Sequence, residues 1–123
     1  PTSLDWLSAY RDDPDTNLLL DRLSSSTPFS KQDVLAVHSA YRDYIRQDRI
    51  SFLDGKLVVF QPVQNDQELL MLIVAPLSLR RDLFSAYRAS PSTGHMGVYK
   101  TLHRIRLRFF WPLCRKDVTA WVL

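Results

Sequence analysis

The sequence predicts an α+β fold, in which helices accompany a small three-stranded antiparallel sheet and a helical, helix-turn-helix-like region follows. Three observations predict it. Apolar residues recur every three or four positions over most of the chain, they alternate with a period near two over residues 50–74, and turn-forming residues separate these stretches. With 123 residues, 46% of them hydrophobic and 24% charged, the chain has the balance of a folded domain and not of a disordered tail.

Two short helices are expected at the start of the chain. Apolar residues at helical spacing follow Ser3, which predicts a first helix capped at that serine. A second helix is expected to begin at Asp13-Pro14, because proline suits the first helical position. The serine-rich stretch 24–28 then predicts a loop.

A longer amphipathic helix is expected over residues 30–47. Ser30 and Asp33 resemble a capping box, with aspartate in place of the usual glutamate. We expect this helix to cover one face of the sheet that follows, because a small sheet needs such a cover to be stable. Its apolar face is formed by Val34, Val37, Tyr41 and Ile45.

Three strands are expected next, joined as a meander. The stretches 50–53 and 56–60 flank an Asp-Gly pair at 54–55, which is typical of a tight hairpin turn. A second turn is expected at 64–67, and the apolar stretch 69–74 forms the third strand.

The last third of the chain is expected to be helical. Ser78 is the expected cap of one helix, a loop follows over 90–94, a second helix is placed over 98–110, and Pro112 opens a third. The order of helix, glycine-containing turn and basic helix is similar to a helix-turn-helix, although the connection is longer than usual.

These elements suggest three segments: a helical connector over 1–29, a helix with the β-meander over 30–75, and a helical domain over 76–123. The longest apolar run, 69–76, is too short to cross a bilayer, so no membrane association is expected. A single cysteine, Cys114, excludes an internal disulfide and suits a reducing intracellular compartment. Because Pro1 is not an initiator methionine and the last residue, Leu123, sits inside a helical pattern, we interpret the chain as a piece of a longer protein.

Charge is distributed unevenly along the chain. The net charge is +3, but residues 1–75 carry −4 and residues 76–123 carry +7. A segment that basic is a candidate for binding a polyanion such as nucleic acid. The alternatives are a solvated basic face, or a basic face paired with the acidic half of the same chain.

The basic residues fall into a pattern on the expected helix over 98–110. Lys100, Arg104 and Arg108 are spaced four residues apart, opposite a narrow apolar stripe, so they would form one row of cations. Arg115 and Lys116 follow at the start of the next helix, where positive charge is unfavourable to the helix dipole. These five residues are the candidate phosphate contacts, and they suit the DNA backbone better than base edges.

No catalytic constellation is present. The sequence has no phosphate loop, no nucleophile elbow and no paired-carboxylate motif in a supporting context, so no enzymatic activity is expected. His38 is interpreted as a packed or surface residue inside a helix and His103 as a packed one, whereas His95 sits in a polar loop where a metal ligand or a cap could lie. His95 alone cannot hold zinc, and a site built from His95, His103 and Cys114 matches no standard spacing.

Two motifs resemble a known family. They are Gly-His-x-Gly-x-x-Lys-Thr at 94–101 and Phe-Trp-Pro at 110–112, between an upstream Val-Ala-Pro at 74–76 and a downstream Lys-Asp-Val at 116–118. Together they resemble the zinc-binding integrase region of gypsy-type long-terminal-repeat retrotransposon polyproteins. The resemblance is strong over 72–123 and looser upstream, where the chain is similar to the connector between the ribonuclease H and integrase regions.

The resemblance implies a zinc site that this chain completes only in part. The family binds zinc through two histidines and two cysteines. His95 matches the second histidine, Tyr87 stands where the first is expected, the cysteines would follow Leu123, and Cys114 matches neither. Because a tyrosine phenol with a pKa near 10 is a poor replacement, we expect no bound cofactor in this chain, with zinc present in the intact family.

The resemblance also implies a function. The chain would be a non-catalytic N-terminal module of a retrotransposon integrase, contributing to DNA binding at the element ends and to multimerisation with itself or with other integrase domains. The catalytic core, with its carboxylates, would lie elsewhere in a polyprotein that also encodes reverse transcriptase, in the nucleus or a cytoplasmic particle. The alternative is a protein-interaction module without DNA affinity, which would use the apolar end formed by Trp111, Trp121, Val122 and Leu123.

Overall fold

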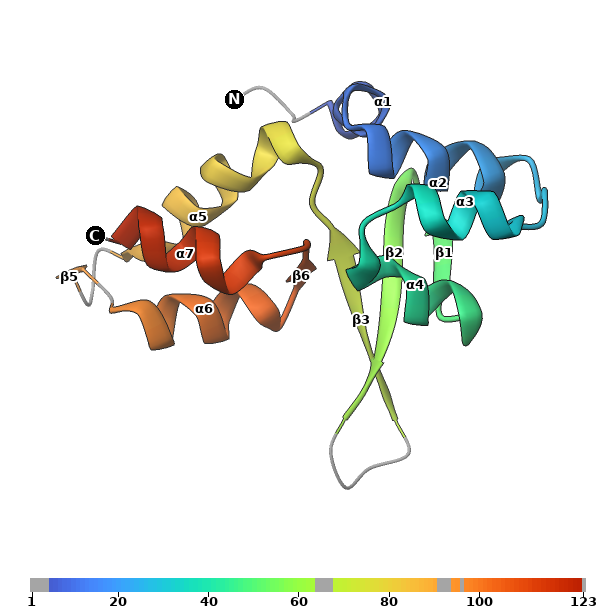
Figure 1. Cartoon of the computed structure of the whole chain (residues 1–123). Helices are drawn as coiled ribbons and strands as arrows, with labels where there is room; N and C mark the ends of the chain where they lie inside the picture. Colours follow the sequence, from blue (N-terminus) through green and yellow to red (C-terminus); the bar gives the residue numbers. More distant parts are fainter. Residues whose placement is uncertain (1–4, 64–67, 91–93, 96, 123) are drawn as a thin grey trace.

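The computed structural model describes residues 5–63, 68–90, 94–95 and 97–122. It confirms the predicted α+β class. Figure 1 shows helices α1 to α4 grouped around a sheet, with α5, α6 and α7 forming a second group beside it, and the β2–β3 hairpin projecting away from both. The last strand, β6, lies between the two groups.

Helices α1 (Trp6–Asp12) and α2 (Pro14–Ser24) are capped by aspartates. The Asp13 carboxylate accepts a hydrogen bond from the Asp15 N–H at 3.1 Å, which confirms the predicted start of α2. The cap of α1 is Asp5, which accepts from the Ser8 N–H at 3.1 Å. The predicted cap, Ser3, lies outside the described residues.

The single helix predicted over 30–47 is wrong, because the chain forms two helices, α3 (Lys31–Ala36) and α4 (Ser39–Arg46). The predicted capping box at the start of α3 is present. Val37 is extended and buried between the helices, and the His38 Nδ1 caps α4 by accepting from the Ala40 N–H at 3.0 Å. Arg42 donates its Nε–H to the Val34 carbonyl at 3.1 Å, which satisfies a backbone acceptor at the end of α3.

The predicted antiparallel meander is present as β1 (Ile50–Leu53), β2 (Lys56–Pro62) and β3 (Leu69–Val74). Asp54 and Gly55 form the first turn with positive φ angles of 51° and 78°, which favours glycine at the second position. The second predicted turn, at 64–67, lies outside the described residues.

A fourth strand, β6 (Phe109–Phe110), pairs in parallel with β3. The helix predicted over 98–110 therefore ends early, since α6 spans Val98–Arg106. The open edge of β3 explains the difference: the Ile73 N–H donates to the Arg108 carbonyl at 2.8 Å and the Ala75 N–H donates to the Phe110 carbonyl at 2.9 Å. Helical periodicity continues into 109–110, but the sheet edge provides these residues with different hydrogen-bond partners.

The helical region also differs in its details. Ser78 lies inside a 3₁₀ turn, η1 (Leu77–Leu79), and not at a cap, and α5 (Arg80–Arg88) follows directly. Two short strands, β4 (Ala89–Ser90) and β5 (Gly94–His95), pair antiparallel between α5 and α6, so the connection is not a simple helix-turn-helix turn. Helix α7 (Cys114–Val122) begins two residues after the predicted Pro112.

Two hydrophobic clusters form the core. The first packs α1, α2 and α4 against the meander, and the second packs α5, α6, α7 and β6 around Trp111, which is 1% exposed. Phe109 belongs to the second cluster, whereas Phe110 packs edge-on against Tyr41 and Tyr44 of the first. Strand β6 therefore inserts one ring into each cluster.

One set of buried polar contacts holds α1 on the sheet, and another joins the two regions. The Tyr10 hydroxyl donates to the Val74 carbonyl at 2.7 Å and accepts from the Leu57 N–H at 3.1 Å. The Asp13 carboxylate accepts from the Leu77 N–H at 3.0 Å and lies 3.4 Å from Arg80 Nη2. Both members of this ion pair are buried, so the start of α2 is fastened to the start of α5.

Candidate nucleic-acid interface

Helix α6 presents one buried side and one broad exposed side. Its buried residues are Thr101, Leu102 and Ile105. At about 100° per residue, the remaining positions form a continuous arc around the exposed side. The arc contains Arg106, Tyr99, His103, Lys100 and Arg104 in that order, and residues 83–116 contain no aspartate or glutamate.

The predicted row of three cations is only partly helical. Lys100 and Arg104 lie one turn apart on α6, but Arg108 follows the end of the helix. The structure nevertheless brings Arg108 to Arg104, because both line a shallow hollow together with Ala86, Tyr87 and Leu107. Lys100, Arg104 and Arg108 are all exposed.

Arg115 and Lys116 extend this surface from the first turn of α7. Both are exposed, and the Arg115 guanidinium lies 5.8 Å from the centre of the Tyr99 ring on α6. The Tyr99 side chain is 77% exposed, so it has little role in the core. The five predicted cations thus flank a single helix, and we call this surface the α6 face; Tyr99 and Arg106 complete it.

The cations of the α6 face have few protein partners. Lys100, Arg108, Arg115 and Lys116 form no ion pair with any residue that the structure describes. The Arg104 guanidinium lies 5.8 Å from the centre of the Tyr87 ring. The ion pair found between the acidic and basic parts of the described chain is Asp13–Arg80, which involves none of these five residues.

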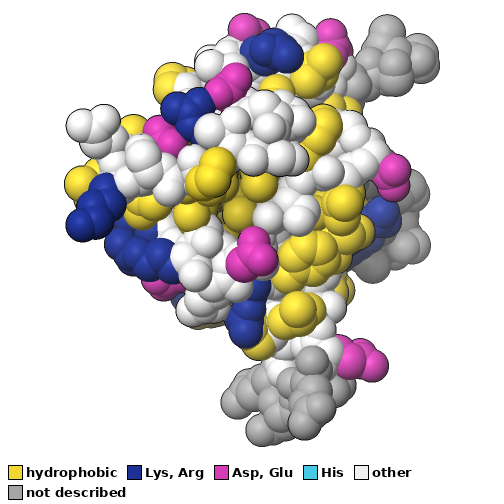
Figure 2. All heavy atoms as spheres, turned by 90° about the vertical axis from the view of Figure 1, so that its right-hand side faces the viewer, with side chains coloured by type: hydrophobic (Ala, Val, Ile, Leu, Met, Phe, Trp, Pro, Cys, Tyr) yellow, Lys and Arg dark blue, Asp and Glu magenta, His cyan; other side chains and the backbone are white. Residues whose placement is uncertain are grey.

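The opposite side of the molecule has a different charge pattern. Figure 2 shows lysine or arginine and aspartate or glutamate side chains interspersed over the N-terminal helices. There Arg22 forms ion pairs with both Asp21 and Asp33, and its hydrogen bonds to Asp33 hold the pKa of that carboxyl below its usual value. A cation that is paired in this way contributes little to an external electrostatic field.

The predicted metal-ligand position can be placed only by its backbone. His95 lies in β5, where it pairs with Ala89. The ring of Tyr87, at the expected first ligand position, packs edge-on against Phe109 with 5.7 Å between centroids. Its neighbour Arg88 carries a permanent charge and cannot bind a metal, so a shift of one position would not supply a ligand.

Cys114 does not complete a metal site either. It is buried in the second cluster, and burial raises the pKa of its thiol to about 11, so it remains protonated at neutral pH. The described residues contain no group of three histidine, cysteine, aspartate or glutamate side chains that could hold a metal ion. The donors among the described residues therefore do not fit a structural zinc ion.

The other two histidines differ from their interpretation from the sequence, which placed His38 inside a helix and His103 in a packed position. His38 caps α4 in the first region, and His103 lies exposed on α6. The aromatic partners of Arg104 and Arg115, Tyr87 and Tyr99, could not be predicted from periodicity, because each contact crosses between two helices. Arg106 was also missed as part of the α6 face.

Comparison with known proteins gives one match. Residues 75–123 match the family model described as the integrase zinc binding domain. No curated protein matches the chain, and no solved structure matches it. Over these residues, which are fewer than half of the chain, the match supports a retroelement integrase N-terminal region. Zinc is implied for the intact family and not for this set of residues.

None of the helices in the described part of the chain is long and apolar enough to cross a bilayer. The basic α6 face and the family match both concern the same segment, since α6, β6 and α7 all lie within 75–123.

Proposed function

We propose that the chain is the non-catalytic N-terminal module of a gypsy-type retrotransposon integrase, and that its α6 face binds duplex DNA at the ends of the element. The observation that carries this proposal is the position of five exposed cations around one helix, in a stretch of 34 residues without a carboxylate. The family match supplies the context of DNA integration.

The chemistry of the α6 face suits the phosphate backbone. Long, flexible lysine and arginine side chains can follow the strand without reading base edges, and each phosphate that they neutralise releases condensed counterions. Tyr99 adds a flat, exposed ring beside Arg115. Binding of this kind is weakly sequence-specific, so the module would position DNA for a catalytic domain and not select its sequence.

The test is binding to a short blunt duplex at several salt concentrations. With about five phosphate contacts, the logarithm of the affinity should fall with the logarithm of salt at a slope of about −4 to −5. The variant Lys100→Glu/Arg104→Glu/Arg108→Glu should lose at least about 100-fold in affinity, because attraction becomes repulsion on one side of α6.

A matched control changes the same number of charges elsewhere. Arg11, Lys31 and Arg46 are exposed in the N-terminal region, so Arg11→Glu/Lys31→Glu/Arg46→Glu gives an identical net charge. This control should retain most of the affinity. Equal losses in the two variants would show that net charge and not the α6 face drives binding, and unchanged binding by the first variant would remove the proposal.

Self-association is the second part of the proposed function, and among its described residues the predicted apolar end is buried or only partly exposed. Trp111 is buried, and Trp121 packs against Phe84 and Trp111 of the second cluster, while Leu123 lies outside the described residues.

A different apolar surface lies on the sheet. The strand register places Leu53, Leu69 and Met71 on one sheet face, with exposed fractions of 45%, 48% and 49%. Figure 2 shows hydrophobic side chains reaching the surface just above the hairpin tip.

We propose that two copies of the chain pair through this sheet face. Met71→Glu should then convert a concentration-dependent dimer into a monomer by light scattering, because a charge would be buried in the contact. Leu35→Glu is the control, since Leu35 is 67% exposed on α3, away from this face. A monomeric wild-type protein over the accessible concentration range would exclude this contact.

A further inference from the structure

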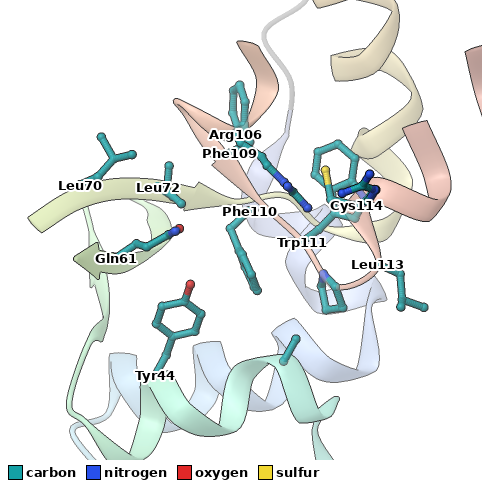
Figure 3. Close-up of a pocket in the computed structure, with 13 residues that line it drawn as sticks. Tyr44, Gln61, Leu70, Leu72, Arg106, Phe109, Phe110, Trp111, Leu113 and Cys114 are labelled. Atoms are coloured by element: carbon teal, nitrogen blue, oxygen red, sulfur yellow. The ribbon is translucent and has the colours of Figure 1, made fainter. Parts of the chain in front are cut away.

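A hollow of about 470 Å³ lies where the two regions meet. Helix α4 and strands β2 and β3 form one wall, and β6 with the start of α7 forms the other, as Figure 3 shows. Its volume is within the range of small-molecule sites, which often occur at such junctions. The proposed DNA face does not account for this hollow, although Arg106 and Arg115 belong to both.

Aromatic rings and unpartnered polar groups line the hollow. The rings of Tyr44 and Phe110 pack edge-on with 5.2 Å between centroids. Figure 3 shows the Tyr44 hydroxyl, from α4, and the Gln61 amide, from β2, directed into the same space. Neither side chain forms a hydrogen bond with another residue that the structure describes. Together they offer both donors and acceptors beside a flat apolar surface.

The charge of the hollow is of one sign. Arg106 and Arg115 are among its thirteen lining residues, and no aspartate or glutamate is. The nearby Asp117 carboxylate lies outside the lining and accepts from the Trp111 Nε1–H at 3.0 Å. An occupant should therefore be flat, carry hydrogen-bonding edges, and be attached to an anion.

We propose that this hollow receives an unpaired nucleobase, with the attached phosphate contacted by Arg106 or Arg115. This inference rests on the proposed DNA binding and deepens it, because it assigns the frayed or single-stranded end of a duplex as the preferred ligand. Arg106 shares α6 with Lys100 and Arg104, so a duplex lying on the α6 face would bring its terminal nucleotides to the hollow. The base packs against the aromatic rings that line the hollow, and the Gln61 amide and the Tyr44 hydroxyl form hydrogen bonds with the polar edge of the base.

The experiment compares a blunt duplex with the same duplex carrying two unpaired nucleotides, one of them the fluorescent base 2-aminopurine. The wild-type chain should bind the extended duplex about tenfold more tightly, as expected for one stacked base, and should quench the fluorescence. Gln61→Leu and Tyr44→Phe should each reduce this preference. Both variants preserve the shape of the side chain, and Tyr44→Phe keeps the ring contact with Phe110.

A control variant separates the hollow from the α6 face. Arg108 does not line the hollow, so Arg108→Gln should weaken binding of both duplexes by the same factor and leave the preference intact. Arg106→Gln should instead reduce the preference for the extended duplex more than the affinity for the blunt one.

The possible outcomes distinguish the two proposals. Salt-dependent binding of both duplexes with equal affinity and no quenching would overturn the inference and leave the proposed function standing. Binding of the extended duplex alone would support the hollow and overturn the proposed role of the α6 face. Binding of neither duplex would overturn both.

Discussion

The regions before and after residue 75 use charged side chains in different ways. Before it, Arg22 pairs with Asp33, Arg46 with Asp43, and Asp13 reaches across to Arg80. After it, Lys100, Arg108, Arg115 and Lys116 form no ion pair with any other described residue. A basic composition therefore indicates a binding surface for anions only where the cations are exposed and form no ion pairs with carboxylates of the same chain.

The two cores differ as well. The first encloses polar hydroxyls, because Tyr10 bonds two backbone groups and Tyr41 is fully buried. The second is an aromatic cluster in which Phe109 contacts Tyr87 and Trp6, and Trp121 contacts Trp111. Packed rings join the helices of this second cluster, so we infer that it is stable without a metal ion.

The largest effect is expected from breaking the joint between the regions. Asp13→Ala removes the cap of α2, the acceptor of the Leu77 N–H, and the partner of the buried Arg80. Leaving a buried charge unpaired should lower the free energy of unfolding by about 3 kcal/mol in urea titrations. Asp12→Ala, at an exposed neighbour, should cost less than about 0.5 kcal/mol. Similar losses in both would contradict a special role for the joint.

A smaller effect should appear in the pH dependence of the first region. The pKa of Asp33 is lowered chiefly by its hydrogen bonds from Arg22, and further by the Ser30 N–H. A lowered pKa in the folded state stabilises the protein above the unfolded value, near 4, and the stabilisation is lost as the pH falls through the folded value. Melting temperatures between pH 6 and pH 2.5 should therefore fall less steeply for Asp33→Asn.

The control for this titration is Asp43→Asn, because the Asp43 side chain is 83% exposed. In this variant the melting temperature should fall with decreasing pH as steeply as in the wild-type protein. If the melting temperature of Asp33→Asn also falls as steeply, the Arg22–Asp33 pair does not contribute to acid sensitivity.

The smallest effect is expected from metal removal. Excess EDTA should shift the melting temperature by less than about 1 °C, because the donors present do not form a zinc site. Added zinc should likewise produce no saturable shift. A stabilisation that saturates at one equivalent of zinc would show that this chain completes a metal site, and it would contradict the inference that packed rings suffice.

Local signals explain which parts of the fold could be predicted. The capping box at Ser30, the Asp-Gly turn and the start of α2 depend on residues that lie within a few positions of each other. The break at His38 was missed because Arg42 satisfies the carbonyls of α3 from the following helix, a contact that periodicity does not reveal. Strand β6 was missed because its partner, β3, lies over thirty residues away.

In the candidate site, too, local sequence predicts some features, whereas others depend on contacts between distant segments. The exposure of Lys100 and Arg104 follows from helical spacing, which the structure retains. Arg108 joins them by a different route, through the end of α6 and the turn into β6. The hollow could not have been predicted, since Tyr44 and Gln61 come from the first region and Phe110 from the second.

The pairing of β6 with β3 has a practical consequence for dividing the chain. The family match begins at residue 75, yet the backbone partners of β6 lie on β3 and at its end. A protein shortened to start at that boundary would lose the strand that accompanies Phe109–Phe110 and expose the ring of Phe110, which otherwise rests on Tyr41 and Tyr44. Expression boundaries drawn from homology alone would therefore cut through a shared sheet, and the isolated piece would be prone to aggregate along its newly bared edge.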